Sequence, residues 1–172
     1  SGYENTESLK MLEGYVDIYL PDFKYMDAGL AGKYSNAPDY PETAKAALAE
    51  MVRQTGSPVF SEDGMMKKGV IVRHLMLPGQ LMDSKHVVKY LYETYGDRIF
   101  MSLMNQYTPL EQVKNIPELN HTVKKQSYKK LIDYALALGV SRAFIQEGET
   151  AKESFIPDFE CQGIAGKDIV IE

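Results

Sequence analysis

One strand-like run in this sequence carries an arginine where an apolar residue is expected. Residues 69–79 read Gly-Val-Ile-Val-Arg-His-Leu-Met-Leu-Pro-Gly, which is almost continuously apolar and ends on Pro-Gly. Such a run, bounded by turn residues, favours a strand buried on both faces of a parallel sheet. An unpaired guanidinium there would cost roughly several kcal/mol, so Arg73 must meet a carboxylate, a phosphate or a cavity. Arg73 is therefore a candidate functional residue.

Apolar runs and helical patterns alternate along the chain. Helices are predicted at Thr6–Glu13 with Asn5 as N-cap, at Pro41–Thr55, from an N-cap at Asp83 or Ser84 to Gly96, and from about Tyr128 to Gly139. The runs predicted as strands are Val16–Leu20, Val70–Leu77, Ile99–Met104 and Arg142–Gln146. Strands that alternate with helices indicate βα units with right-handed crossovers. The sequence therefore predicts an α/β fold with a parallel sheet, whose strands lie side by side in chain order.

Two segments between these elements have a character of their own. Asp63-Gly64 predicts a hairpin turn just before the arginine strand. The stretch Tyr25–Tyr40 is polar and irregular, and we expect a long loop there, of the kind that often carries function. No repeat or linker divides the 172 residues, which indicates a single domain over residues 1–172.

Composition excludes several classes of function. The net charge is −5 with no basic stripe, which argues against nucleic acid and against a polybasic membrane anchor. No apolar run is long enough to span a bilayer, so a soluble, cytoplasmic protein is expected. Cys161 is the single cysteine, which excludes an intramolecular disulfide and a multi-cysteine metal site within this chain. No metal, dinucleotide or phosphate-loop motif is present, and His74 is expected to be a packed, hydrogen-bonded histidine.

Polar residues follow the predicted strands at their carboxyl ends. Asp22 and Lys24 come after the first strand and, being two apart on an extended chain, should project to the same side. Gln106 and Tyr107 come after the third. Parallel sheets bind ligands at this end, so these residues and Arg73 would fit a ligand with a carboxylate and hydroxyls. The alternative is that Asp22 and Lys24 form a solvated loop ion pair of little energetic value.

Five segments also carry a resemblance to a known family: Ser1–Glu4, Val16–Tyr25, Lys33–Tyr40, Gly69–Gly79 and Met104–Tyr107. They resemble, in order over about the first 140 residues, the radical S-adenosylmethionine (SAM) proteins related to pyruvate formate-lyase activating enzyme. The resemblance implies a partial, TIM-like (β/α)₆ barrel with helices on its outer face. In that family a Cys-x-x-x-Cys-x-x-Cys loop after the first strand binds a [4Fe–4S] cluster. The reduced cluster cleaves SAM to a 5′-deoxyadenosyl radical that abstracts hydrogen.

The three-cysteine motif is missing here, so the chain looks like the C-terminal half of such a barrel. The resemblance implies an oxidoreductase whose cofactors are SAM and a [4Fe–4S] cluster, with the cluster ligands outside this chain. The isolated chain should then be inactive, and the residues that perform catalysis stay unknown. The implied partners are a protein substrate, such as a glycyl radical enzyme, and a reductant such as flavodoxin or ferredoxin.

The resemblance also implies roles for matching residues. Asp22 and Lys24 match an Asp-x-Lys whose side chains contact the ribose and methionine parts of SAM. Arg73 matches an arginine that pairs with the methionine carboxylate. Tyr107 stands where those enzymes tend to have a histidine, and Gln106 precedes it.

The rival to this hypothesis is a non-catalytic α/β binding or assembly module, in which Asp22, Lys24 and Arg73 form a structural ion-pair network. These hypotheses differ in whether the three side chains line one open crevice or pair beneath packed side chains.

Loss of a preceding strand would also expose the edge of Val16–Leu20, so self-association, or cover by a terminal segment of the chain, is expected there.

Overall fold

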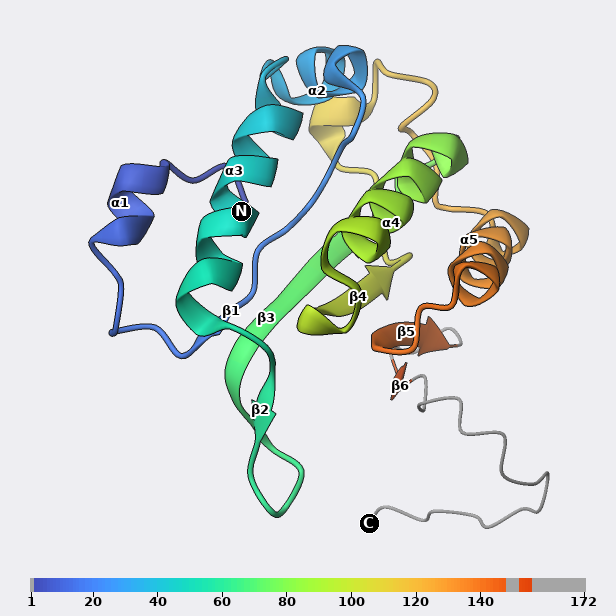
Figure 1. The fold of residues 1–172 in the computed structure, drawn as a ribbon. Coiled ribbons are helices and arrows are strands. Elements are labelled where there is room, and N and C mark those ends of the chain that lie inside the picture. The colour runs from blue at the N-terminus through green and yellow to red at the C-terminus, as the bar shows by residue number, and fades with distance from the viewer. Residues whose placement is uncertain (1, 148–151, 156–172) are drawn as a thin grey trace, which may run out of the picture.

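The computed structural model describes residues 2–147 and 152–155. Two 3₁₀ helices lie at Gly96–Arg98 and Glu111–Val113. The other elements, in chain order, are α1 (Thr6–Lys10), β1 (Ile18–Tyr19), α2 (Ala28–Ser35), α3 (Tyr40–Thr55), β2 (Val59–Phe60), β3 (Met66–Leu75), α4 (Leu81–Tyr95), β4 (Phe100–Met104), α5 (Lys125–Leu138), β5 (Ala143–Glu147) and β6 (Lys152–Phe155) (Figure 1). Within the described residues, no helix combines the length and the apolar character needed to cross a bilayer.

The strands form one mixed sheet in the order β1-β3-β4-β5-β6. β1, β3, β4 and β5 are parallel to one another, whereas β6 is antiparallel to β5 and β2 is antiparallel to β3. This confirms the predicted α/β class, the chain-order arrangement of the parallel strands and the interior position of the arginine strand. The antiparallel strand β6 was not predicted.

The two faces of the sheet differ in what covers them. Helices α3, α4 and α5 lie on one face (Figure 1), and the β3 side chains that point to it, Val70, Val72 and His74, are almost fully buried. The opposite face carries Arg73, its register partner Ser102 on β4 and, next along the row, Phe144 on β5. In Figure 1, α3, α4 and α5 all lie on the first face. Arg73 therefore lies on the side of the sheet away from these three helices.

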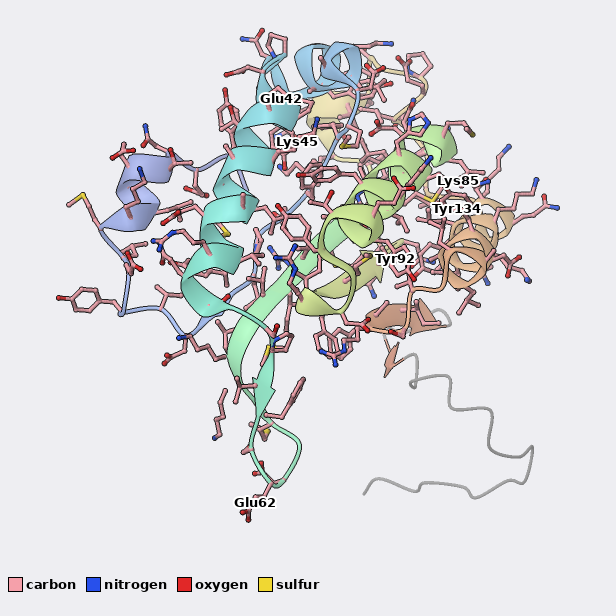
Figure 2. The ribbon with its side chains drawn as sticks, viewed as in Figure 1. Glu42, Lys45, Glu62, Lys85, Tyr92 and Tyr134 are labelled. Atoms are coloured by element: carbon pink, nitrogen blue, oxygen red, sulfur yellow. The ribbon has the colours of Figure 1, made fainter. Side chains whose placement is uncertain are left out.

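The predicted strands and helices are found, with shifted ends. β3 starts at Met66 rather than Val70, because Met66 and Lys68 pair with β2 across the predicted hairpin. β1 is shorter than predicted, but its pairing with β3 resumes at an isolated bridge between Asp22 and Arg73. In the hairpin itself Gly64 has a φ of 80°, and Glu62 lies at the tip (Figure 2).

Two sequence-based expectations were wrong. The segment Tyr25–Tyr40 is not one long loop, since it contains α2, whose N-terminus is capped by Asp27 accepting from the Leu30 N–H. α2 is hard to recognise in the sequence because it spans only eight residues and contains two glycines. Neither Asp83 nor Ser84 caps α4, which begins at Leu81 after Gln80. Asp83 instead lies in the first turn and bonds to a different segment.

Helices α4 and α5 pack against each other beside the sheet. The Lys85 ammonium lies 4.9 Å from the centre of the Tyr134 ring (Figure 2). At the end of α5, Gly139 has a φ of 93°, and a Cβ there would come within 2.8 Å of the Tyr92 hydroxyl. Glycine at this position thus permits the left-handed backbone at the end of the helix and leaves room for the Tyr92 hydroxyl.

The edge of the sheet at β1 is partly covered by the N-terminal segment. A hollow of about 250 Å³ beside β1 is lined by Gly2, Glu4, Leu9, Leu12, Tyr19, Leu20, Pro21 and Met51. Leu20 is still 53% exposed. Cover by a terminal segment, one of the two expected outcomes, is therefore present in part, and self-association through this edge stays a prediction.

His74 is the buried histidine that the sequence led us to expect. It is 1% exposed, and its Nδ1 lies 2.7 Å from the carbonyl oxygen of Phe23. Burial lowers its pKa from 6.5 to about 4, so the ring is neutral at pH 7 and Nδ1–H donates to Phe23.

This burial should make folding stability depend on pH. Between about pH 6.5 and 4 the unfolded chain binds a proton at His74 that the folded chain does not, so stability should fall as the pH falls. The resulting loss in the free energy of unfolding should approach about 3 kcal/mol at low pH. Denaturant unfolding of the wild type and of His74→Gln across this range measures it. His74→Gln should lose this part of the dependence of unfolding free energy on pH, whereas His121→Gln, at an exposed histidine, should keep it. An equal pH dependence in all three proteins would contradict this role of His74.

Candidate functional site

The chain directly after β1 stays extended and pairs with β3. The Arg73 N–H donates to the Pro21 carbonyl, and the Phe23 N–H donates to the Arg73 carbonyl, both at 2.8 Å. Side chains on an extended segment alternate, so Phe23, 1% exposed, enters the core. Asp22 and Lys24 point the other way and, as the sequence predicts, share one side.

Arg73 meets a carboxylate, as its place in an apolar strand requires. Its Nε and Nη2 both reach Asp22 Oδ1, at 2.8 and 2.7 Å. The Arg73 side chain is 43% exposed and that of Asp22 is 25% exposed, so water screens the pair and its net contribution to stability is small. The pair therefore orients two polar groups at the surface more than it holds the fold together.

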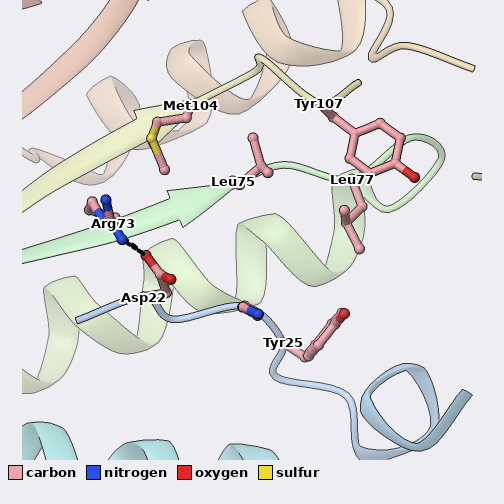
Figure 3. A pocket seen from close by; sticks show the side chains of 8 residues that line it. Asp22, Tyr25, Arg73, Leu75, Leu77, Met104 and Tyr107 are labelled. Carbon is pink, nitrogen blue, oxygen red and sulfur yellow. Dashed lines mark hydrogen bonds and ion pairs between the residues drawn. The ribbon is translucent and has the colours of Figure 1, made fainter. Parts of the chain in front are cut away.

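A pocket of about 390 Å³ opens beside this ion pair (Figure 3). Asp22, Lys24 and Arg73 form its polar part. Its other lining residues, which are apolar or aromatic, are Tyr25, Leu75, Leu77, Met104 and Tyr107. The pocket is thus amphipathic, with a charged wall formed by β3 and the segment after β1, and an apolar wall formed mainly at the carboxyl ends of β3 and β4.

The structure brings four of the five predicted site residues together. Asp22, Lys24, Arg73 and Tyr107 line the pocket, whereas Gln106 is exposed and is not among the lining residues. Burial, followed by the nearby Tyr25 and Tyr34, raises the pKa of Tyr107, which keeps its hydroxyl protonated at neutral pH. Gln106 and Tyr107 both lie in the irregular segment that follows β4, and of the two only Tyr107 faces the pocket.

Sequence reasoning missed the apolar wall and the residues that hold the charged wall. Leu75 and Leu77 follow Arg73 at two-residue steps, so the strand period could have placed them on the same face. Asp83 could not have been found this way, because it acts on a segment far away in the chain. Its carboxylate accepts from the N–H groups of Met26, at 3.1 Å, and Asp27, at 2.8 Å.

These residues can bind a ligand that combines anionic, hydroxyl and apolar parts. Arg73 and Lys24 supply positive charge, Asp22 accepts hydrogen bonds, and the apolar wall can contact a flat or aliphatic group. Among residues 2–147 and 152–155, no group of three His, Cys, Asp or Glu side chains could hold a metal ion.

Comparison with known proteins adds one relative. The chain is 23% identical over 133 residues to an uncharacterized protein of Methanocaldococcus jannaschii. The match covers 77% of this chain but 35% of the relative, so the chain spans about a third of that protein. No family model matches the chain, and no solved structure does.

The Asp83 contacts can be tested by substitution. Asp83→Ala would leave the amides of Met26 and Asp27 without their acceptor and should lower the free energy of unfolding by about 1–3 kcal/mol. Hydrogen exchange should accelerate at these two amides. As a control, Asp133→Ala removes an aspartate from the exposed Lys129 pair and should change stability by less than about 0.5 kcal/mol. Unchanged exchange at both amides would contradict this role of Asp83.

Proposed function

We propose that this chain is the C-terminal portion of a radical SAM enzyme related to pyruvate formate-lyase activating enzyme, and that its pocket forms part of the SAM site. The observation that carries the proposal is the convergence of Asp22, Lys24 and Arg73 on one open pocket at the carboxyl ends of parallel strands. The sequence resemblance assigns SAM contacts to these same three residues.

The chemistry of the pocket fits SAM. The methionine carboxylate of SAM matches the Arg73 guanidinium, which can offer a planar pair of N–H donors to a carboxylate. Asp22 and Lys24 match the ammonium and hydroxyl groups of the methionine and ribose parts. Tyr25, Leu77 and Tyr107 line the part of the pocket that is suited to flat or apolar groups. When bound, SAM supplies the radical chemistry, and this chain's residues bind and orient it.

The arrangement of the sheet is consistent with a partial (β/α)₆ barrel. Consecutive parallel strands lie in chain order, with α3, α4 and α5 on one face, as in the wall of a barrel (Figure 1). The face with Arg73 would then be the interior. On this proposal the cluster ligands lie in the other part of the barrel, and the enzyme is cytoplasmic. It receives electrons from flavodoxin or ferredoxin and acts on a protein such as a glycyl radical enzyme.

One observation favours the rival hypothesis of a non-catalytic binding or assembly module. Asp22 and Arg73 are already paired, as a structural ion pair would be. However, this pair lies on the wall of an open pocket and not beneath packed side chains (Figure 3). Lys24 is exposed at the same wall. The SAM proposal accounts for the pocket as well as for the pair.

The simplest test is to determine the coding sequence upstream of the codon for Ser1. A Cys-x-x-x-Cys-x-x-Cys motif in frame would support the proposal, and its absence would contradict it. With iron and sulfide under anaerobic conditions, the full-length protein should form a [4Fe–4S] cluster. The 172-residue chain alone should form none, because its one cysteine cannot replace three thiolate ligands.

Arg73 should control affinity for the methionine part of SAM. In the full-length protein, Arg73→Met should weaken SAM binding by about 10- to 100-fold. Binding of 5′-methylthioadenosine, which lacks the methionine carboxylate, should change much less. Arg98→Met is a matched control, because Arg98 is exposed and donates to the Thr94 carbonyl instead of lining the pocket. Equal losses for both ligands, or none for SAM, would contradict the role of Arg73.

A further inference from the structure

The extended segment after β1 has backbone groups that face away from β3. Pro21 O and Phe23 N pair with β3. The intervening Asp22 carbonyl and the Lys24 N–H point to the opposite side, where a further strand would pair in a wider sheet. β1 is the edge strand among the described residues, so no strand in this part of the chain satisfies these two groups.

A single side-chain hydroxyl takes the place of that strand. The Tyr40 O–H donates to the Asp22 carbonyl at 3.0 Å, and the Tyr40 hydroxyl oxygen accepts from the Lys24 N–H at 3.0 Å. The hydroxyl thus bridges the backbones of the two pocket residues that flank Phe23. Leaving either backbone group without a partner would be costly, because both are partly buried.

The Tyr40 ring is held firmly enough to fix this bridge. It is 3% exposed and stacks on Tyr3, with ring centroids 5.7 Å apart. It also makes edge contacts with Phe23 and Tyr25, at 6.4 and 5.5 Å. Burial raises the pKa of Tyr40 well above its usual value, so the hydroxyl stays protonated and able to donate.

A neighbouring residue closes the same edge. Gly2 has a φ of 80°, and a Cβ on it would lie 1.8 Å from the Asp22 carbonyl oxygen. Only glycine fits so close to this backbone. Tyr40 and Gly2 therefore confine Asp22 from the side opposite to β3.

We propose that Tyr40 is a positioning residue, whose hydroxyl sets the spacing of Asp22 and Lys24 and so determines how tightly the pocket binds its ligand. This inference rests on the proposed SAM site, because it takes SAM as the ligand. Tyr40 does not line the SAM pocket. It acts through the backbone of the two residues that do.

Tyr40→Phe tests this role, since it removes the hydroxyl and keeps the ring. The matched control is Tyr19→Phe. The Tyr19 hydroxyl is also bonded, to Gln54 Oε1 at 2.7 Å, and Tyr19 is 7% exposed, but it does not line the pocket. SAM binding is measured without reductant on the full-length wild type and both variants. Denaturant unfolding and amide hydrogen exchange are measured on the same three proteins.

Tyr40→Phe should weaken SAM binding about tenfold, while Tyr19→Phe leaves it within about twofold at a comparable loss of stability. Hydrogen exchange at the Lys24 amide should accelerate in Tyr40→Phe, and the Phe23 amide, bonded to Arg73, should stay protected. Equal SAM affinity in both variants would overturn the positioning role, as would unchanged Lys24 exchange. A wild type that binds no SAM would instead contradict the proposed function, whereas the exchange result would still show whether Tyr40 fixes this backbone.

Discussion

The pairing between the segment Pro21–Lys24 and Arg73 determines most of what this chain offers to a ligand. The backbone of Arg73 holds that segment in register with β3, and its side chain meets Asp22 on the face of the sheet opposite to α3, α4 and α5. Because the arginine points away from the face packed against the helices and its side chain is 43% exposed, its charge costs little in the apolar part of β3. The same geometry puts a cation, a carboxylate and Lys24 around one pocket.

The charged wall of the pocket is held by groups that come from several elements. His74 on β3 bonds to the Phe23 carbonyl, Tyr40 on α3 bonds to Asp22 and Lys24, and Asp83 on α4 bonds to the amides that follow. None of these contacts is between neighbours in the chain. The position of the candidate site therefore depends on how α3 and α4 pack against the sheet, and a change in that packing would reach the pocket through these hydrogen bonds.

The sequence predicts the parts of this structure that depend on local pattern. The parallel strand order, the hairpin at Asp63 and the shared side of Asp22 and Lys24 all follow from periodicity and turn residues. α2 does not stand out in the sequence because it is short and contains two glycines. Asp83 was misread as a helix cap, since residue type alone cannot tell a carboxylate that caps its own helix from one that bonds to a distant loop. The apolar wall of the pocket could have been read from the strand period, but the support from Tyr40 could not.

We propose that Asp22, Lys24 and Arg73 bind the methionine and ribose parts of SAM at the carboxyl end of a parallel sheet. A crystal structure of the full-length protein with SAM tests it most directly. We expect the methionine carboxylate within hydrogen-bond distance of the Arg73 guanidinium, with Asp22 and Lys24 contacting the same ligand. SAM bound away from this pocket, with the Asp22–Arg73 pair unchanged and far from the ligand, would contradict the claim.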